Sequence, residues 1–183
     1  MQLTPEHIEL QNSLEKFIDA EINPHVDEWE EQEIYPAHEL FKKMGGLGFL
    51  GIGKPEEFGG SGLDYSYEAI GAFASGRITS LGVAAAIGVQ TNMCTPALTR
   101  HGSDELRKEF LVPTIAGEFV GCVGVTESGA GSDVASLKTT ARKDGDDYII
   151  NGRKWLITGM FGASYQILMA RTFDKDGKDL GAT

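Results

Sequence analysis

The spacing of apolar residues changes at Gly117, and no other feature of the 183-residue sequence constrains its fold as much. Up to that point apolar residues recur at intervals of three and four, which is typical of helices that bury one face. After it the chain becomes a series of short strand-like runs between turn residues: VGCVGV, LKTTARK, YIINGRKWLIT and YQILMAR. Helices followed by strands are typical of the α+β class. We therefore predict an all-α domain over residues 1–118 and the first part of an antiparallel β-domain over residues 119–183.

Local signals place helices within the first of these domains. Thr4 is a suitable helix cap, and Pro5 suits the first helical position. Ser103 caps the stretch SDELRKEFL in the same way, and Leu106 is expected on its buried stripe together with Phe110 and Leu111. We expect helices over residues 5–22, 36–44, 65–76, 81–100 and 103–111.

The strand region contains a turn signal and an incomplete sheet. Asn151-Gly152 lies between apolar runs and predicts a type I′ hairpin. Three or four strands that finish at Thr183 would leave a long edge unpaired, which natural domains normally cover or shorten. We therefore expect the chain to be truncated at its carboxyl end.

Charge is distributed unevenly along the sequence. Residues 1–62 hold 13 acidic and 4 basic residues, whereas residues 119–183 hold 8 of each. Phosphate binding needs clustered Lys and Arg, so this distribution argues against nucleic acid and anionic membranes as partners. An anionic small ligand is compatible only with the neutral carboxyl third.

The cysteines and the amino terminus indicate the compartment. Cys94 and Cys122 lack CxxC spacing and a nearby His pair, so neither a disulfide framework nor a metal site is indicated. The amino terminus has no export or transit pattern, and the longest weakly polar run, residues 81–89, is too short to cross a bilayer. We expect a soluble protein of a reducing compartment.

The stretch GVTESGAGSD at residues 124–133 is the most informative candidate site. An apolar strand leads into a turn of small residues, whose backbone amides can hold a phosphate or a polar ring edge. The hydroxyls of Thr126 and Ser132 add further donors. A plain structural turn explains the composition equally well. Neither a P-loop nor a dinucleotide-binding fingerprint occurs in the chain.

Several stretches in register resemble one protein family. VTESGAGSDVASLKTTARKDGDDYIINGRKWLIT resembles the central signature of the acyl-CoA dehydrogenases, flavoproteins that bind FAD between a middle β-domain and helical domains. PEEFGGSGLDY and GSDELRKEFLVPTIAGEFVGCVGVTE are similar to the same family in order and spacing. INPHVDEWE and AIGVQTNMCTPAL are similar to its citronellyl-CoA dehydrogenase-like branch, which handles branched acyl chains.

The resemblance implies specific contacts. In the family, the position of Thr126 bonds the edge of the flavin ring, that of Ser132 lies near the CoA part of the substrate, and a second strand brings the position of Thr158 to the reactive ring nitrogen. The helix bearing Val89, Asn92 and Met93 would line part of the acyl pocket. The cofactor-binding residues implied are Val123, Gly124, Val125, Thr126, Gly131, Ser132, Leu156, Ile157 and Thr158.

Two residues near these segments need separate interpretation. The family usually has an aromatic residue at the position of Leu156, whereas here Trp155 precedes it, and neighbouring side chains on a strand point to opposite faces. We interpret Trp155 as a buried or interface aromatic in preference to one stacked on the flavin. In the family, the equivalent of Glu127 is structural, held by backbone groups or by a basic neighbour.

The reaction implied is FAD-dependent α,β-desaturation of an acyl-CoA in lipid metabolism. The base belongs to a carboxyl-terminal helical domain that is absent here, so this segment alone is expected to be inactive and to contain no catalytic residue. An electron-transfer flavoprotein as acceptor, a homotetramer, and a bacterial cytoplasm or mitochondrial matrix are also implied. An acyl-CoA oxidase, a flavin-dependent hydroxylase, and a non-catalytic fragment or assembly module remain alternatives.

Overall fold

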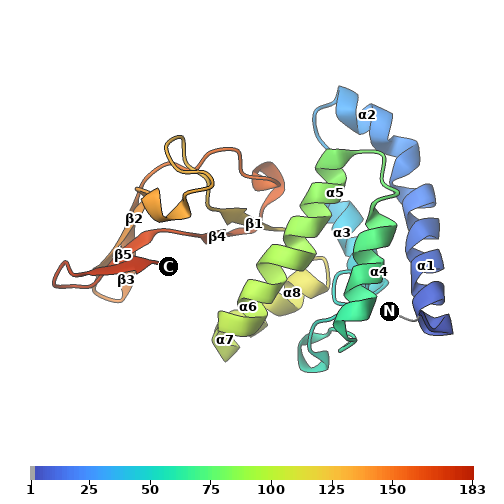
Figure 1. Ribbon diagram of the computed structural model, residues 1–183, viewed down its shortest axis with the longest axis horizontal. Coiled ribbons are helices and arrows are strands. Elements are labelled where there is room, and N and C mark those ends of the chain that lie inside the picture. The colour runs from blue at the N-terminus through green and yellow to red at the C-terminus, as the bar shows by residue number, and fades with distance from the viewer. Residues whose placement is uncertain (1–2) are drawn as a thin grey trace.

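The computed structural model describes residues 3–183 as a group of helices followed by strands (Figure 1). The α-helices are α1 (Pro5–Glu21), α2 (Val26–Glu31), α3 (Ala37–Gly46), α4 (Tyr65–Ser75), α5 (Leu81–Gly88), α6 (Thr95–His101), α7 (Asp104–Leu106) and α8 (Val112–Ile115). The strands are β1 (Gly121–Gly124), β2 (Thr140–Asp144), β3 (Asp147–Asn151), β4 (Tyr165–Leu168), β5 (Arg171–Phe173) and β6 (Asp179–Ala182). The α+β prediction is confirmed. None of the helices in residues 3–183 combines the length and the apolar content that a bilayer crossing needs.

Helix α1 begins where the sequence signals predict. Thr4 precedes the helix, Pro5 occupies its first position, and the Thr4 N–H donates to Nδ1 of His7 at 3.2 Å. Leu14, Phe17 and Ile18 are buried in the main core, which is shared with α3 and α5. The cap and the apolar spacing therefore agree on the start and on the buried face.

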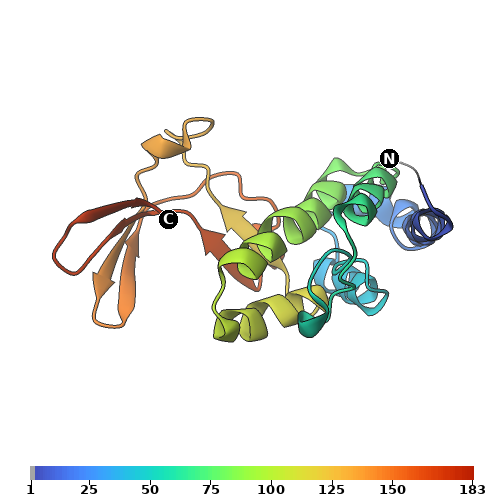
Figure 2. The same ribbon diagram turned by 60° about the horizontal axis from the view of Figure 1, so that its bottom comes forward.

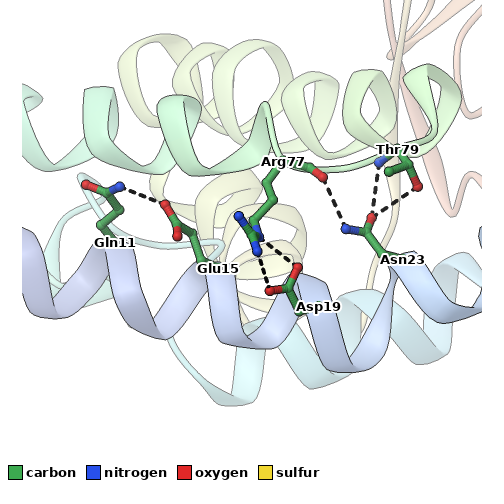
Figure 3. A network of polar contacts seen from close by, with 6 residues as sticks. All are labelled: Gln11, Glu15, Asp19, Asn23, Arg77 and Thr79. Atoms are coloured by element: carbon green, nitrogen blue, oxygen red, sulfur yellow. Dashed lines mark hydrogen bonds and ion pairs between the residues drawn. The ribbon is translucent and has the colours of Figure 1, made fainter.

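Polar contacts fix the end of α1 against the turn between α4 and α5 (Figure 3). Arg77 donates to Asp19 through Nε and through its second terminal nitrogen, at 2.7 and 2.8 Å. Asn23 accepts from the Thr79 N–H at 3.1 Å and donates to the Arg77 carbonyl at 3.1 Å. These groups are exposed, so they contribute more to the register of the helices than to stability.

Helices α5 and α6 continue one another through a π-helical segment, η3 (Val89–Cys94). Pro96 follows η3. It has no N–H to donate to the carbonyl of the residue four positions earlier, and its ring crowds that carbonyl. The same relation recurs at η4 (Arg107–Leu111), which is followed by Pro113 in α8. We infer that each proline widens the turn before it, as a π-bulge does.

Gln90 of η3 joins the helices to the first strand. Its side chain is fully buried, and Nε2 donates to the carbonyls of Phe119 and Thr114 at 2.8 and 3.2 Å. Oε1 accepts from the Gly121 N–H at 2.8 Å. One amide therefore binds the residues on both sides of the passage from α8 into β1. Helices α5 and α6, joined end to end by η3, lie between the strands and helices α1 to α4 (Figure 2).

The strands form a pair, β1–β4, and a sheet of order β3-β2-β5-β6. The hairpins β2–β3 and β5–β6 are antiparallel, as predicted, whereas β1–β4 and β2–β5 are parallel. In each parallel pair the later strand lies beside the earlier one and runs in the same direction. Strand β4 pairs with β1 in this way, and β5 pairs with β2.

The predicted hairpin at Asn151-Gly152 is wrong. The turn lies at Gly145 and Asp146, where Gly145 has a φ of 60°, and Asn151 is the last residue of β3. A Cβ on Gly152 would lie 2.7 Å from Cα of Thr139, so glycine is needed there for close packing. Leu106 is also not part of a buried stripe, because it is 44% exposed on the short helix α7 while Leu111 is fully buried.

We expect Gln90→Leu to lower the free energy of unfolding by about 3 kcal/mol, because it removes the side-chain partners of the Phe119 carbonyl and the Gly121 N–H and leaves the Thr114 carbonyl with the Gly117 N–H alone. Urea unfolding measures this. Gln11→Leu is the matched control, because the Gln11 amide bonds only the neighbouring Glu15 side chain, and we expect a change within about 0.5 kcal/mol. Equal stability of the two variants would show that the Gln90 contacts do not hold the strands to the helices.

Candidate functional site

A tight turn follows β1 at the stretch that the sequence singles out. The Glu127 N–H donates to the Ala130 carbonyl at 2.9 Å, and the Ala130 N–H donates back to the Glu127 carbonyl at 3.2 Å. Thr126 before the turn is half-buried, and Gly131 and Ser132 after it are exposed. Two backbone hydrogen bonds between Glu127 and Ala130 therefore close the turn, and its small residues Ser128 and Gly129 are exposed to solvent.

The second predicted segment packs directly against this turn. The Trp155 N–H donates to the Thr126 carbonyl at 2.8 Å. Lys154 Nζ donates to the Val125 carbonyl at 2.9 Å. The two residues directly before Leu156–Thr158 therefore hold that segment next to the turn through one backbone and one side-chain hydrogen bond.

The second segment is not a strand, which corrects the prediction for residues 156–158. Leu156 lies in the left-handed region at a φ of 55°, and Gly159 follows at 78°. The chain turns there instead of extending, because no neighbouring strand pairs with it among the described residues. A non-glycine residue in this backbone region is strained, and such strain is common at functional sites.

The nine predicted cofactor residues lie in three places. Val123 and Gly124 pair with β4 inside β1, and Val125 and Thr126 continue from it. Gly131 and Ser132 lie beyond the tight turn. The third group follows Trp155. Leu156 and Thr158 are exposed, and Ile157 between them is half-buried.

An exposed apolar group surrounds the end of the second segment. Leu156 is 81% exposed and Trp155 is 44% exposed, while Met160 and Phe161 are also exposed. Trp155 is therefore not buried, and the Arg153 guanidinium lies 5.2 Å from the centre of its ring. The sequence analysis did not identify Met160 and Phe161, although an adjacent apolar pair after a glycine was a visible signal.

Glu127 is held from three sides. Lys138 N–H donates to Oε2 at 2.7 Å, and Thr139 N–H and Lys154 Nζ each donate to Oε1 at 2.9 Å. Burial alone would raise the pKa of Glu127, but hydrogen bonds from these residues outweigh it and lower the pKa to about 2. Its predicted structural contacts with backbone groups and a basic neighbour are confirmed. A carboxylate this acidic is a poor proton acceptor at neutral pH.

The thiols near the site are also unreactive. Burial raises the pKa of Cys94 to about 12, and burial raises the pKa of Cys122 as well. Both side chains are fully buried, and Cys122 Sγ lies 3.6 Å from Met160 Sδ. Because the thiolate is the nucleophilic form, these residues pack and do not react. Among the predicted cofactor residues, Thr126, Ser132 and Thr158 have hydroxyls that a ligand could use.

Glu127→Gln should lower the free energy of unfolding by about 3 kcal/mol at neutral pH, because it leaves the buried Lys154 ammonium without its counter-charge. The folded pKa lies below the ordinary 4.5, so ionised Glu127 stabilises the fold above about pH 4.5 and loses this effect as the pH falls toward 2. The difference between variant and parent should therefore narrow below about pH 4.5.

Urea unfolding of both proteins over this pH range provides the measurement. The exposed Glu57→Gln is the control and should change stability by less than about 0.5 kcal/mol at each pH. A difference that stays constant with pH would contradict the assigned role of the Glu127 charge.

Family models match both parts of the chain. Residues 4–118 match the model described as acyl-CoA dehydrogenase, N-terminal domain, and residues 122–183 match the model described as acyl-CoA dehydrogenase, middle domain.

Individual relatives agree with these matches. The chain is 32% identical to mitochondrial isovaleryl-CoA dehydrogenase of Bos taurus over 93% of its own length and 40% of that protein. It is 38% identical to acyl-CoA dehydrogenase FadE29 of Mycobacterium tuberculosis over 99% of its length and 46% of that protein.

A solved structure shares the fold. The acyl-CoA dehydrogenase of Bacillus anthracis complexed with FAD matches with a TM-score of 0.87 and 33% identity, over 97% of this chain and 30% of that one. The chain spans less than half the length of each of these relatives. The matches to two successive domains, in the order in which helices and strands occur here, show that the chain belongs to the acyl-CoA dehydrogenase family.

Proposed function

We propose that the chain forms part of an FAD-dependent enzyme that desaturates an acyl-CoA thioester between its α and β carbons. The observation that carries this proposal is the hydrogen bond from the Trp155 N–H to the Thr126 carbonyl, because it ties the residue directly before Leu156–Thr158 to the first segment assigned to the flavin. In this proposal, residues 1–118 form the helical domain and residues 119–183 belong to the domain that contacts the cofactor.

The exposed groups at this junction fit a flavin. An isoalloxazine ring has an apolar face and a polar edge, so its site needs exposed apolar groups beside hydrogen-bond donors. Leu156 and Trp155 provide exposed apolar surface, and Thr126 and Thr158 provide hydroxyls on the two segments that meet. When bound, FAD would supply the hydride-accepting centre.

The residues of this chain have positioning roles in the proposed reaction. The Thr158 and Thr126 hydroxyls bond the ring edge and orient it, and Ser132 lies toward the CoA part of the substrate. Part of the acyl site is lined by three residues of η3: Val89, Asn92 and Met93. Glu127 fixes the turn and does not remove the α-proton, because its charge is already satisfied by three donors.

The partners follow from this chemistry. The substrate is an acyl-CoA, and a reduced flavin needs an electron acceptor, for which we propose an electron-transfer flavoprotein. We also propose a homo-oligomer for the intact enzyme.

The test is FAD binding by the purified protein, measured by visible absorbance and by quenching of flavin fluorescence. Thr158→Val should weaken binding about tenfold, because it removes one hydrogen bond to the ring while keeping the shape of the side chain. Thr140→Val is the control, since Thr140 lies in β2 and its hydroxyl makes only a long 3.4 Å contact with the Asn151 carbonyl.

Two outcomes would contradict the proposal. An intact enzyme containing this chain that stays colourless after incubation with FAD and dialysis would exclude the cofactor. Equal affinity of Thr158→Val and the parent would exclude Thr158 from the ring edge, and loss of affinity in Thr140→Val alone would place the flavin elsewhere.

A further inference from the structure

A pocket of about 290 Å³ lies inside the helical part of the molecule, away from the strands. Helices α1, α3, α4 and α5 form its walls, together with η3 and the segment 49–54. Most of its lining is apolar, with Leu14, Phe49, Ile52 and Ile87 among the larger side chains. One water molecule takes up about 30 Å³ in the liquid. If each non-hydrogen atom of a ligand takes up a similar volume, the pocket suits a chain of roughly ten such atoms.

One side of this pocket carries a buried ion pair. Lys54 Nζ lies 2.7 Å from Glu68 Oε1, and both residues line the pocket. The Lys54 side chain is only 7% exposed, whereas that of Glu68 is 24% exposed. Among residues 3–183, Glu68 is the one acceptor of the Lys54 ammonium, which has three N–H donors. A buried lysine beside an apolar pocket therefore has donors left for a ligand.

The glycine-dense loop of residues 48–63 builds this arrangement. A Cβ on Gly53 would lie 2.5 Å from Glu68 Oε1, and a Cβ on Gly60 would lie 2.7 Å from Cβ of Lys54. The Gly62 N–H donates to the Lys54 carbonyl at 2.9 Å. The loop therefore packs tightly on both members of the ion pair, and their placement does not depend on a flexible surface side chain.

We propose that this pocket binds an aliphatic chain that carries a neutral oxygen, such as a hydroxyl group, and that Lys54 donates to that oxygen. The Lys54–Glu68 pair has no net charge, so a carboxylate in the pocket would add an uncompensated buried charge. A hydroxyl accepts from Lys54 and can donate to Glu68, whereas a plain alkyl chain would leave the ammonium donors unpaired.

The chain is the tail of the acyl group, and this part of the inference rests on the proposed acyl-CoA function. Thr91 and Asn92 of η3 line the pocket, and η3 is the segment that we assign to the acyl site. Gln90 of the same segment reaches β1 on another side. One short segment therefore borders both the pocket and the strand that leads to the flavin site.

The first experiment compares the affinities of octanoyl-CoA, ω-hydroxyoctanoyl-CoA and suberyl-CoA for the 183-residue protein with FAD added, by isothermal titration. We expect the hydroxylated thioester to bind at least about tenfold more tightly than the other two, since a hydrogen bond to a charged group contributes that much. Equal or tighter binding of octanoyl-CoA or suberyl-CoA would overturn the proposal.

Variants locate the effect. Lys54→Met combined with Glu68→Leu replaces the ion pair by apolar groups of similar size, which proteins commonly tolerate, and should abolish the preference for the hydroxyl. Lys43→Met combined with Glu21→Leu is the matched control, because that ion pair is exposed and does not line this pocket. A preference that survives the first change, or disappears with the second, would also overturn the proposal.

A second probe separates this inference from the proposed function. Binding of n-octanol to the protein without FAD or CoA is followed by NMR shifts of the Ile52 and Ile87 methyl groups. Octanol binding that needs Lys54 and Glu68, together with no binding of any CoA thioester by the intact enzyme that contains this chain, would support the pocket and overturn the acyl-CoA function. Absence of methyl shifts with octanol would overturn the pocket itself.

Discussion

The placement of the strands against the helices depends on the buried amide of Gln90. Buried backbone groups need partners where the chain leaves α8 and enters β1, because the regular bonds of a helix and a sheet are interrupted there. Gln90 bonds three of these groups from a single side chain: the carbonyls of Thr114 and Phe119 and the N–H of Gly121. Gln90 lies in η3, the widened helical turn before Pro96. The same short segment therefore contains the backbone change that we attribute to the proline and the side chain that bonds the start of the strands.

Two lysine–carboxylate pairs, the buried Glu127–Lys154 pair and the pair of buried Lys54 with half-buried Glu68, differ in the number of hydrogen bonds that they make. Glu127 accepts from two backbone N–H groups as well as from Lys154, and Lys154 also donates to Val125, so every strong contact is internal. Lys54 has Glu68 alone among residues 3–183. A saturated polar network rigidifies a structure, whereas an unsaturated one beside a pocket can bind a further group. Both pairs consist of a lysine and a glutamate, so the residue types do not separate a structural role from a binding role. The number of hydrogen-bond partners does.

Local signals predicted the helices better than the strands. Thr4 and Pro5 define the start of α1 through contacts with the next few residues, so the sequence contains the whole cause. The hairpin was predicted at Asn151-Gly152, although Asp144-Gly145 is a dipeptide that also suits a turn. The register of β2 with β3 selects the first, and the packing of Gly152 on Thr139 explains the second glycine. Neither fact is visible before strands are paired.

The sequence indicates which segments form the candidate site, but it does not predict their geometry. The turn after β1 forms from its own small residues, whereas the shape of residues 155–159 depends on a hydrogen bond to Thr126, nearly thirty positions earlier. That bond holds an irregular, exposed segment whose Leu156 backbone is strained. Because so few contacts fix it, the position of Thr158 follows that of Thr126 and of the Glu127–Lys154 pair behind it. The geometry of the proposed flavin contacts therefore depends on a buried carboxylate behind the turn.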